Sequence, residues 1–97
     1  MQNYRTVDCE VWARRFIKKH QGKGFMRLIE IKPQPPGRYL GGILMPTGMQ
    51  TPLWYNHFAV LLNGKIHDEA YPDGLPQEQF KARFEYREVI DFIERSV

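Results

Sequence analysis

The 97-residue chain has a single cysteine, Cys9, and this scarcity excludes two kinds of structure. One thiol cannot form a disulfide within the chain, and it cannot build a zinc site from cysteines. A lone thiol is typical of a reducing compartment or of a catalytic nucleophile. We therefore expect a cytoplasmic protein.

Long apolar runs are also missing. The longest, Phe58–Leu62, has five residues, whereas a helix that crosses a bilayer needs about 20. The first residues, Met1–Arg5, contain no apolar segment of the kind found in signal peptides. We expect no membrane partner and no export by way of a signal peptide.

The charge is not strongly of one sign, because 14 Lys and Arg residues oppose 11 Asp and Glu residues. Residues 1–27 hold seven Lys and Arg residues against two acidic ones, and residues 85–97 hold four acidic residues against two basic ones. A basic surface suits an acidic partner or nucleic acid. A solvated helix face explains these basic residues more simply, so we expect no nucleic-acid partner.

Repeats, linkers and phosphate-binding loops are absent, which favours a single domain over residues 1–97. Gly22 and Gly24 precede an expected strand rather than open a helix, which gives no support to a dinucleotide site. The possible ligands Cys9, His57 and Asp68 lack the local spacing of a metal site. We therefore expect no metal and no cofactor.

What is present is a series of short elements. Residues 8–20 are predicted to form a helix that begins at Asp8. Its buried stripe is expected to contain Val11, Trp12, Phe16 and Ile17, with Arg14, Arg15, Lys18 and Lys19 in water. Residues 25–32 are predicted to form a strand with one slipped position in its alternation.

The rest of the chain is less regular. Prolines and glycines in residues 33–52 allow only short or edge pairing, so this segment is a binding loop, a lid or a plain connection. A short helix capped near Pro76 is expected over residues 77–84. The tail, residues 85–97, fits either a helix or a final strand, the latter built on Phe84, Tyr86 and Val89.

The clearest local signal is Asn63-Gly64, the preferred pair for a two-residue hairpin turn. It lies between two expected strands, Tyr55–Leu62 and Lys65–Ala70. The turn makes Leu62 the partner of Lys65, and this pairing sets the register of the whole hairpin.

This register places a histidine beside a carboxylate. His57 faces Ala70, and Ala59 faces Asp68, so His57 and Asp68 are diagonal neighbours on one face of the hairpin. Asp68 would then hold and orient the imidazole of His57. His67 lies on the opposite face and is excluded from this pair.

Cys9 supplies a third group. It lies in the first turn of the expected helix, where free backbone N–H groups and the helix dipole favour a thiolate. A thiolate, a base and an orienting carboxylate form the arrangement used in nucleophilic catalysis. The alternative is a small buried cysteine beside a core histidine; the spacing does not decide between them.

The order of these motifs resembles a known family. Asp8–Ala13 (DCEVWA), Asn56–Val60 (NHFAV), Gly64–Asp68 (GKIHD) and the turn Pro72-Asp73-Gly74 resemble papain fold toxin 2, a domain of bacterial polymorphic toxin systems. The resemblance extends from Cys9 to about Phe84. It implies a minimal papain-like α+β fold, with the cysteine-bearing helix packed on an antiparallel sheet.

The resemblance also implies roles and partners. It makes Cys9 the nucleophile, His57 the base and Asp68 the orienting residue, acting in a bacterial cytoplasm on a protein or peptide. Asn3 and Gln2 are candidates for the amide side chain that papain-like enzymes use in the oxyanion hole, together with the backbone N–H of Cys9. A cognate immunity protein is the implied partner.

Two features depart from the family pattern. The family domain normally ends a much longer secreted polypeptide, whereas this chain is short and begins with Met1. Glu69 follows Asp68 where a polar amide is expected, and a second carboxylate there would perturb the pair with His57.

We therefore expect a cysteine-dependent amide hydrolase, either a peptidase or a glutamine deamidase. Two alternatives stay open: an acyl transferase that uses the same thioester, and a non-catalytic protein-binding module. In that module, residues 33–52 and Trp54-Tyr55 form a docking surface. A partly exposed Cys9 that reacts at neutral pH distinguishes the enzyme from the module.

Overall fold

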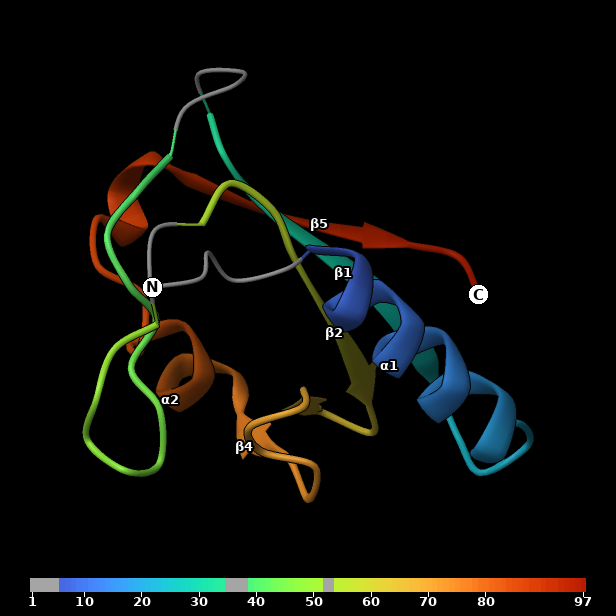
Figure 1. Ribbon diagram of the computed structural model, residues 1–97. Helices are drawn as coiled ribbons and strands as arrows, with labels where there is room; N and C mark the ends of the chain where they lie inside the picture. Colours follow the sequence, from blue (N-terminus) through green and yellow to red (C-terminus); the bar gives the residue numbers. More distant parts are fainter. Residues whose placement is uncertain (1–5, 35–38, 52–53) are drawn as a thin grey trace.

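The structure is a computed structural model that describes residues 6–34, 39–51 and 54–97. The strands form one antiparallel sheet in the order β4-β3-β2-β1-β5 (Figure 1). The elements in chain order are α1 (Thr6–Lys19), β1 (Met26–Pro33), β2 (His57–Leu62), β3 (Lys65–His67), β4 (Leu75–Pro76), α2 (Gln77–Lys81), the 3-10 helix η1 (Arg87–Val89) and β5 (Ile90–Arg95). The predicted α+β fold, with the cysteine-bearing helix on an antiparallel sheet, is confirmed.

Helix α1 begins at Thr6, so Asp8 lies within its first turn and not at the predicted N-cap. The predicted buried position of Val11 is also wrong, because its side chain is 44% exposed. At about 100° per residue, Val11 points away from Cys9, and the stripe at i, i+4, i+7 and i+8 faces the sheet instead. That stripe consists of Cys9, Ala13, Phe16 and Ile17.

Strand β1 is regular, and the predicted slipped position is wrong. Its pairing with β2 runs without interruption from Met26 opposite Leu62 to Ile31 opposite His57. Both faces of β1 are buried, which explains why its apolar residues do not alternate simply. Met26 faces α1, whereas Ile31 faces the second core on the other side of the sheet.

The predicted hairpin turn and its register are confirmed. Asn63 and Gly64 both have positive φ, 51° and 85°, and Leu62 pairs with Lys65. Strand β3 ends at His67, however, three residues before the predicted end. A turn begins there, because the Asp68 carboxylate accepts a hydrogen bond from the backbone N–H of Tyr71 at 2.8 Å.

The second face of the sheet is covered by α2 and by the described part of the irregular segment (Figure 1). As expected, pairing in that segment is short, and Ile43 makes an isolated bridge with Phe84. Helix α2 begins directly after Pro76, as expected, but it ends at Lys81, before the predicted end at residue 84. The core on this face contains Ile29, Ile31, Ile43, Trp54, Ala59, Leu61, Ile66, Phe80, Phe84 and Ile90.

The tail forms a strand, and its only helical part among the described residues is the short 3-10 helix η1. β5 covers residues 90–95 and pairs with the outer edge of β1, so the strand lies after the residues predicted to form it. Tyr86 has φ of 60°, so the chain changes direction before η1, and Phe84 is separated from the strand.

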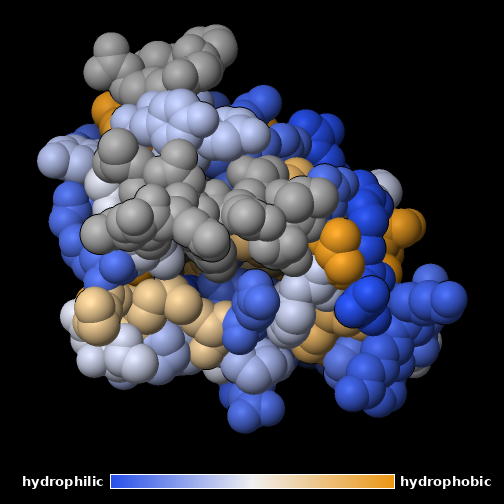
Figure 2. All heavy atoms as spheres, in the orientation of Figure 1, coloured by the Kyte–Doolittle hydropathy of each residue, from blue (hydrophilic) through white to orange (hydrophobic). Residues whose placement is uncertain are grey.

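The surface seen in Figure 2 is largely hydrophilic, with apolar residues in separate places. In the described residues, no helix has the length and apolar character needed to cross a membrane.

Candidate active site

The predicted contact between His57 and Asp68 is confirmed. His57 opens β2, Asp68 follows β3 directly, and His57 Nε2 lies 3.1 Å from Asp68 Oδ2. The hairpin register brings the two side chains to one face, although β3 ends too early for the predicted pairs at Ala59 and Ala70 to form. Both side chains are buried.

Cys9 joins this pair from the opposite side of the imidazole. Its Sγ lies 3.2 Å from His57 Nδ1, a contact that links α1 to the start of β2. The first turn of α1 therefore holds the thiol beside His57 at the start of β2. The structure thus contains a Cys-His-Asp arrangement that joins both nitrogens of one imidazole ring to the other two groups.

The charge of Asp68 determines the tautomer of His57. Burial by itself would raise the pKa of Asp68, but the hydrogen bond from His57 and the charges of His57 and Arg83 outweigh it and lower this pKa to about 2. An ionised carboxylate only accepts hydrogen bonds, so His57 Nε2 carries the proton of that bond. In neutral His57, Nδ1 is then the acceptor that faces the Cys9 thiol.

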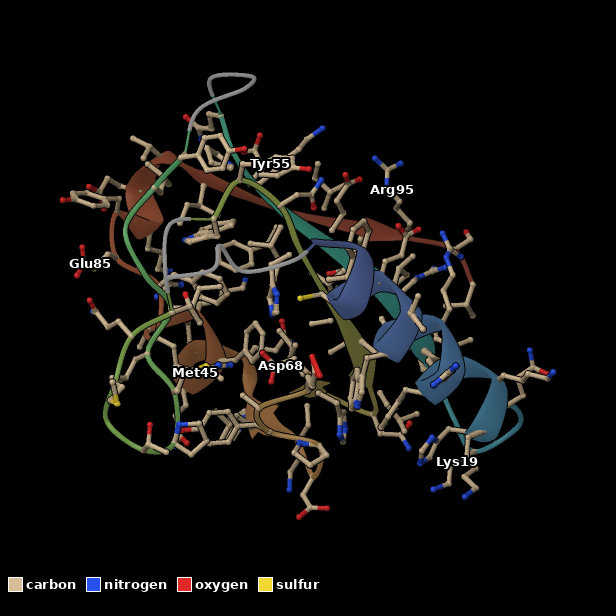
Figure 3. The ribbon with its side chains drawn as sticks, viewed as in Figure 1. Lys19, Met45, Tyr55, Asp68, Glu85 and Arg95 are labelled. Atoms are coloured by element: carbon tan, nitrogen blue, oxygen red, sulfur yellow. The ribbon has the colours of Figure 1, made fainter. Side chains whose placement is uncertain are left out.

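Arg83 is the member of this site that the sequence interpretation missed. Its Nη1 donates to Asp68 Oδ2 at 2.9 Å, and its side chain is only 5% exposed. It falls near the end of the helix predicted over residues 77–84, and nothing in its spacing links it to Asp68. Figure 3 shows Asp68 in the interior, between α1 and the segment that carries Met45.

Cys9 is less exposed than we expect of a catalytic cysteine. We expected a partly exposed thiol, but Cys9 and His57 are each 1% exposed. A groove of about 410 Å³ runs along α1. Its lining consists of Trp12, Arg15, Phe16, Lys19, His20, Pro72 and Asp73. Cys9 does not reach this groove, so a reagent needs a local movement to contact the sulfur.

The other candidates are separate from the site. Asn3 and Gln2, the proposed amides of the oxyanion hole, lie outside the described residues. His67 lies on the other face of the hairpin, as predicted, with its ring 4.8 Å from that of Phe16. Among residues 6–34, 39–51 and 54–97, no group of His, Cys, Asp and Glu side chains is placed to hold a metal ion.

The chain matches no protein-family model, no curated protein and no solved structure. The resemblance to papain fold toxin 2 thus stays a prediction that depends on its short motifs.

Proposed function

We propose that this protein is a cysteine-dependent hydrolase of an amide bond, a peptidase or a glutamine deamidase of the papain-like toxin kind. The observation that carries the proposal is the continuous contact from the Cys9 thiol through both nitrogens of His57 to the Asp68 carboxylate, at 3.2 and 3.1 Å. Cys9 lies 48 residues before His57, whereas His57 and Asp68 belong to one hairpin.

The chemistry follows from the direction of these bonds. His57 Nδ1 takes the thiol proton, and the Cys9 sulfur attacks the carbonyl carbon of the amide. The C–N bond then breaks, the amine leaves with the proton that His57 returns, and a thioester forms on Cys9. Water, deprotonated by His57, attacks the thioester; the carboxylic acid leaves and the thiol is restored. Asp68 stays ionised throughout and orients the ring.

The position of Cys9 in the first turn of α1 supports the oxyanion step. Backbone N–H groups at a helix start point toward a bound anion, and the Cys9 N–H is our candidate donor. An amide from Asn3 or Gln2 belongs to the same proposal. We further propose a protein or peptide substrate, action in a bacterial cytoplasm, and inhibition by an immunity protein. An amine acceptor in place of water would make the enzyme an acyl transferase.

One observation favours the competing function, a non-catalytic binding module. Cys9, His57 and Asp68 are nearly inaccessible, as expected of side chains that serve only to hold the fold. In that case, the exposed aromatic pair Tyr39 and Tyr55, with ring centroids 5.1 Å apart, belongs to the docking surface. The predicted part of Trp54 in that surface is wrong, because its side chain is 0% exposed.

The pH dependence of Cys9 alkylation distinguishes the two functions. Because Cys9 is the only thiol, its reaction with iodoacetamide can be followed by mass spectrometry in the native protein. A Cys–His pair is expected to keep a reactive thiolate below about pH 7, whereas an ordinary thiol loses its reactivity below about pH 8.5. The shape of the profile is compared, because burial slows the reaction at every pH.

His57→Ala and Asp68→Asn complete the test, with His67→Ala as the control for loss of a histidine. We expect His57→Ala to move the profile to higher pH and His67→Ala to leave it in place. If His57→Ala leaves the pH profile of Cys9 alkylation unchanged, the result would contradict the hydrolase and support the binding module. If the profile agrees, release of ammonia or of new amino termini from a peptide library separates deamidation from peptide cleavage.

A further inference from the structure

Arg83 contacts the site and a distant segment at the same time. While Nη1 donates to Asp68, Nε donates to the carbonyl oxygen of Leu44 at 2.8 Å. The backbone completes this link, since the Leu44 N–H donates to the carbonyl oxygen of Arg83 at 2.9 Å. The guanidinium also lies over the ring of Tyr71, 4.5 Å from its centroid. Arg83 is therefore fixed on several sides.

The segment held by Arg83 is a small hairpin over residues 43–51. Leu44 bridges to Gln50, and the Thr51 N–H donates to the carbonyl oxygen of Ile43 at 3.0 Å. The turn of this hairpin carries Met49, which is 71% exposed. A surface element is thereby tied to a buried carboxylate through one side chain.

We infer that Arg83 is a positioning residue for this site. It balances the charge of Asp68, holds that carboxylate against His57, and ties both to the 43–51 hairpin. This role rests on the proposed function only where it concerns the reactivity of Cys9. The effect on His57 itself follows from the contacts whether or not the protein is an enzyme.

The argument is electrostatic. Asp68 Oδ2 accepts from His57 and from Arg83, so the guanidinium compensates part of the negative charge that the imidazole meets. Around His57 the structure shows the Cys9 thiol from α1 and Asp68 after β3, whereas β1 presents the apolar Ile31 opposite it. Without Arg83, the buried carboxylate would attract the protonated ring more strongly. His57 would then stay protonated to a higher pH.

The test uses the full chain with Arg83→Gln, which removes the charge, and Arg83→Lys, which keeps it. Arg87→Gln is the matched control, because Arg87 pairs with Glu78 at the surface. The ring signals of the histidines are followed by NMR against pH, and the His57 signal is identified by its loss in His57→Ala. Sucrose in every sample favours the folded state, so that Arg83→Gln can be titrated.

We expect the midpoint of the His57 titration to rise by about one pH unit in Arg83→Gln. The midpoint should stay within about 0.3 unit in Arg83→Lys and in Arg87→Gln, since the charge near Asp68 is retained in both. An unchanged midpoint in Arg83→Gln would overturn the inference. A shift in Arg83→Lys as large as one unit would overturn it too, because lost packing would then be the cause.

Cys9 alkylation measured on the same samples keeps the two proposals apart. If the wild-type profile does not depend on His57, the hydrolase proposal fails, while the His57 titration still decides the role of Arg83. If the His57 midpoint rises in Arg83→Gln and the alkylation profile moves to lower pH, both proposals are supported, because a more basic imidazole takes the thiol proton more readily.

Discussion

At the scale of single residues, Asp68 is the point where separate parts of the chain meet. Its Oδ1 accepts from the N–H of Tyr71, and its Oδ2 accepts from His57 and Arg83. A buried carboxylate is stable only when such donors replace the water it has lost. Asp68 thus closes the turn after β3 and orients the imidazole with the same group.

Because of this environment, we expect the free energy of unfolding to fall as the pH is lowered. The pKa of Asp68 is lowered from 3.8 to about 2 in the folded chain, so the unfolded state binds its proton first as pH falls. Asp68 therefore contributes its full stabilisation, about 2 kcal/mol, above about pH 5. Most of this contribution is lost by about pH 2.5.

Urea unfolding at pH 5 and pH 2.5 measures this loss. In Asp68→Asn the dependence should be weaker, and the variant should be less stable at pH 7 by about 3–5 kcal/mol, because Arg83 is left buried without its carboxylate. Asp91→Asn, at an exposed position of β5, is the control and should behave as wild type. If Asp68→Asn and wild type lose the same stability between pH 5 and pH 2.5, the lowered pKa of Asp68 is not the cause of the acid dependence.

At the scale of elements, the turn Asn63-Gly64 does more than join β2 to β3. The side chain of Asn63 accepts a hydrogen bond from the N–H of Phe25 at 3.1 Å and donates one to the carbonyl oxygen of Lys23 at 3.2 Å. A Cβ at Gly24 would lie 2.2 Å from Asn63 Oδ1, so any larger residue would displace the Asn63 side chain from these two hydrogen bonds. The turn is thereby fastened to the connection between α1 and β1.

Gly64→Ala is expected to destabilise the fold by about 1–2 kcal/mol, because an L-residue is strained in the left-handed region. Nothing lies within 4 Å of the added Cβ, so strain is the only cause. Gly64→Asn should cost less, since asparagine tolerates this conformation. Urea denaturation of the three proteins checks the order. A Gly64→Ala variant as stable as wild type would contradict the turn geometry.

At the scale of the whole molecule, the sheet is covered on both faces, and the site lies where the two coverings meet. Helix α1 packs on one face and brings Cys9, while α2 and the 43–51 hairpin cover the other face and bring Arg83. His57 connects the two layers through its ring nitrogens. Access to Cys9 consequently requires that part of this double covering moves.

We predict that Cys9 becomes accessible through local opening and not through unfolding of the whole chain. Local openings need less free energy than global unfolding and are insensitive to distant destabilisation. The alkylation rate of Gly64→Ala should therefore stay within about twofold of wild type. If Cys9 reacts only from the unfolded state, a loss of 1–2 kcal/mol would raise the rate by about 5–30-fold. Mass spectrometry of the alkylated fraction over time decides between these outcomes.

The sequence by itself determined the local features of this protein. Asn63-Gly64 specified the hairpin, and its register placed His57 beside Asp68, because strand periodicity and turn geometry are local properties. The glycines after α1 and the position of Cys9 at a helix start were determined in the same way.

The tertiary structure alone decided which distant groups meet. It brought Cys9 to His57, 48 residues apart in the chain, and it placed Arg83 on Asp68. It also decided that residues 90–95 form β5. Their apolar spacing fits a helix as well, and pairing with the edge of β1 favours the strand. Burial of the site, too, depends on how the two layers pack on the sheet, because exposure is a property of long-range packing and has no local signal in the sequence.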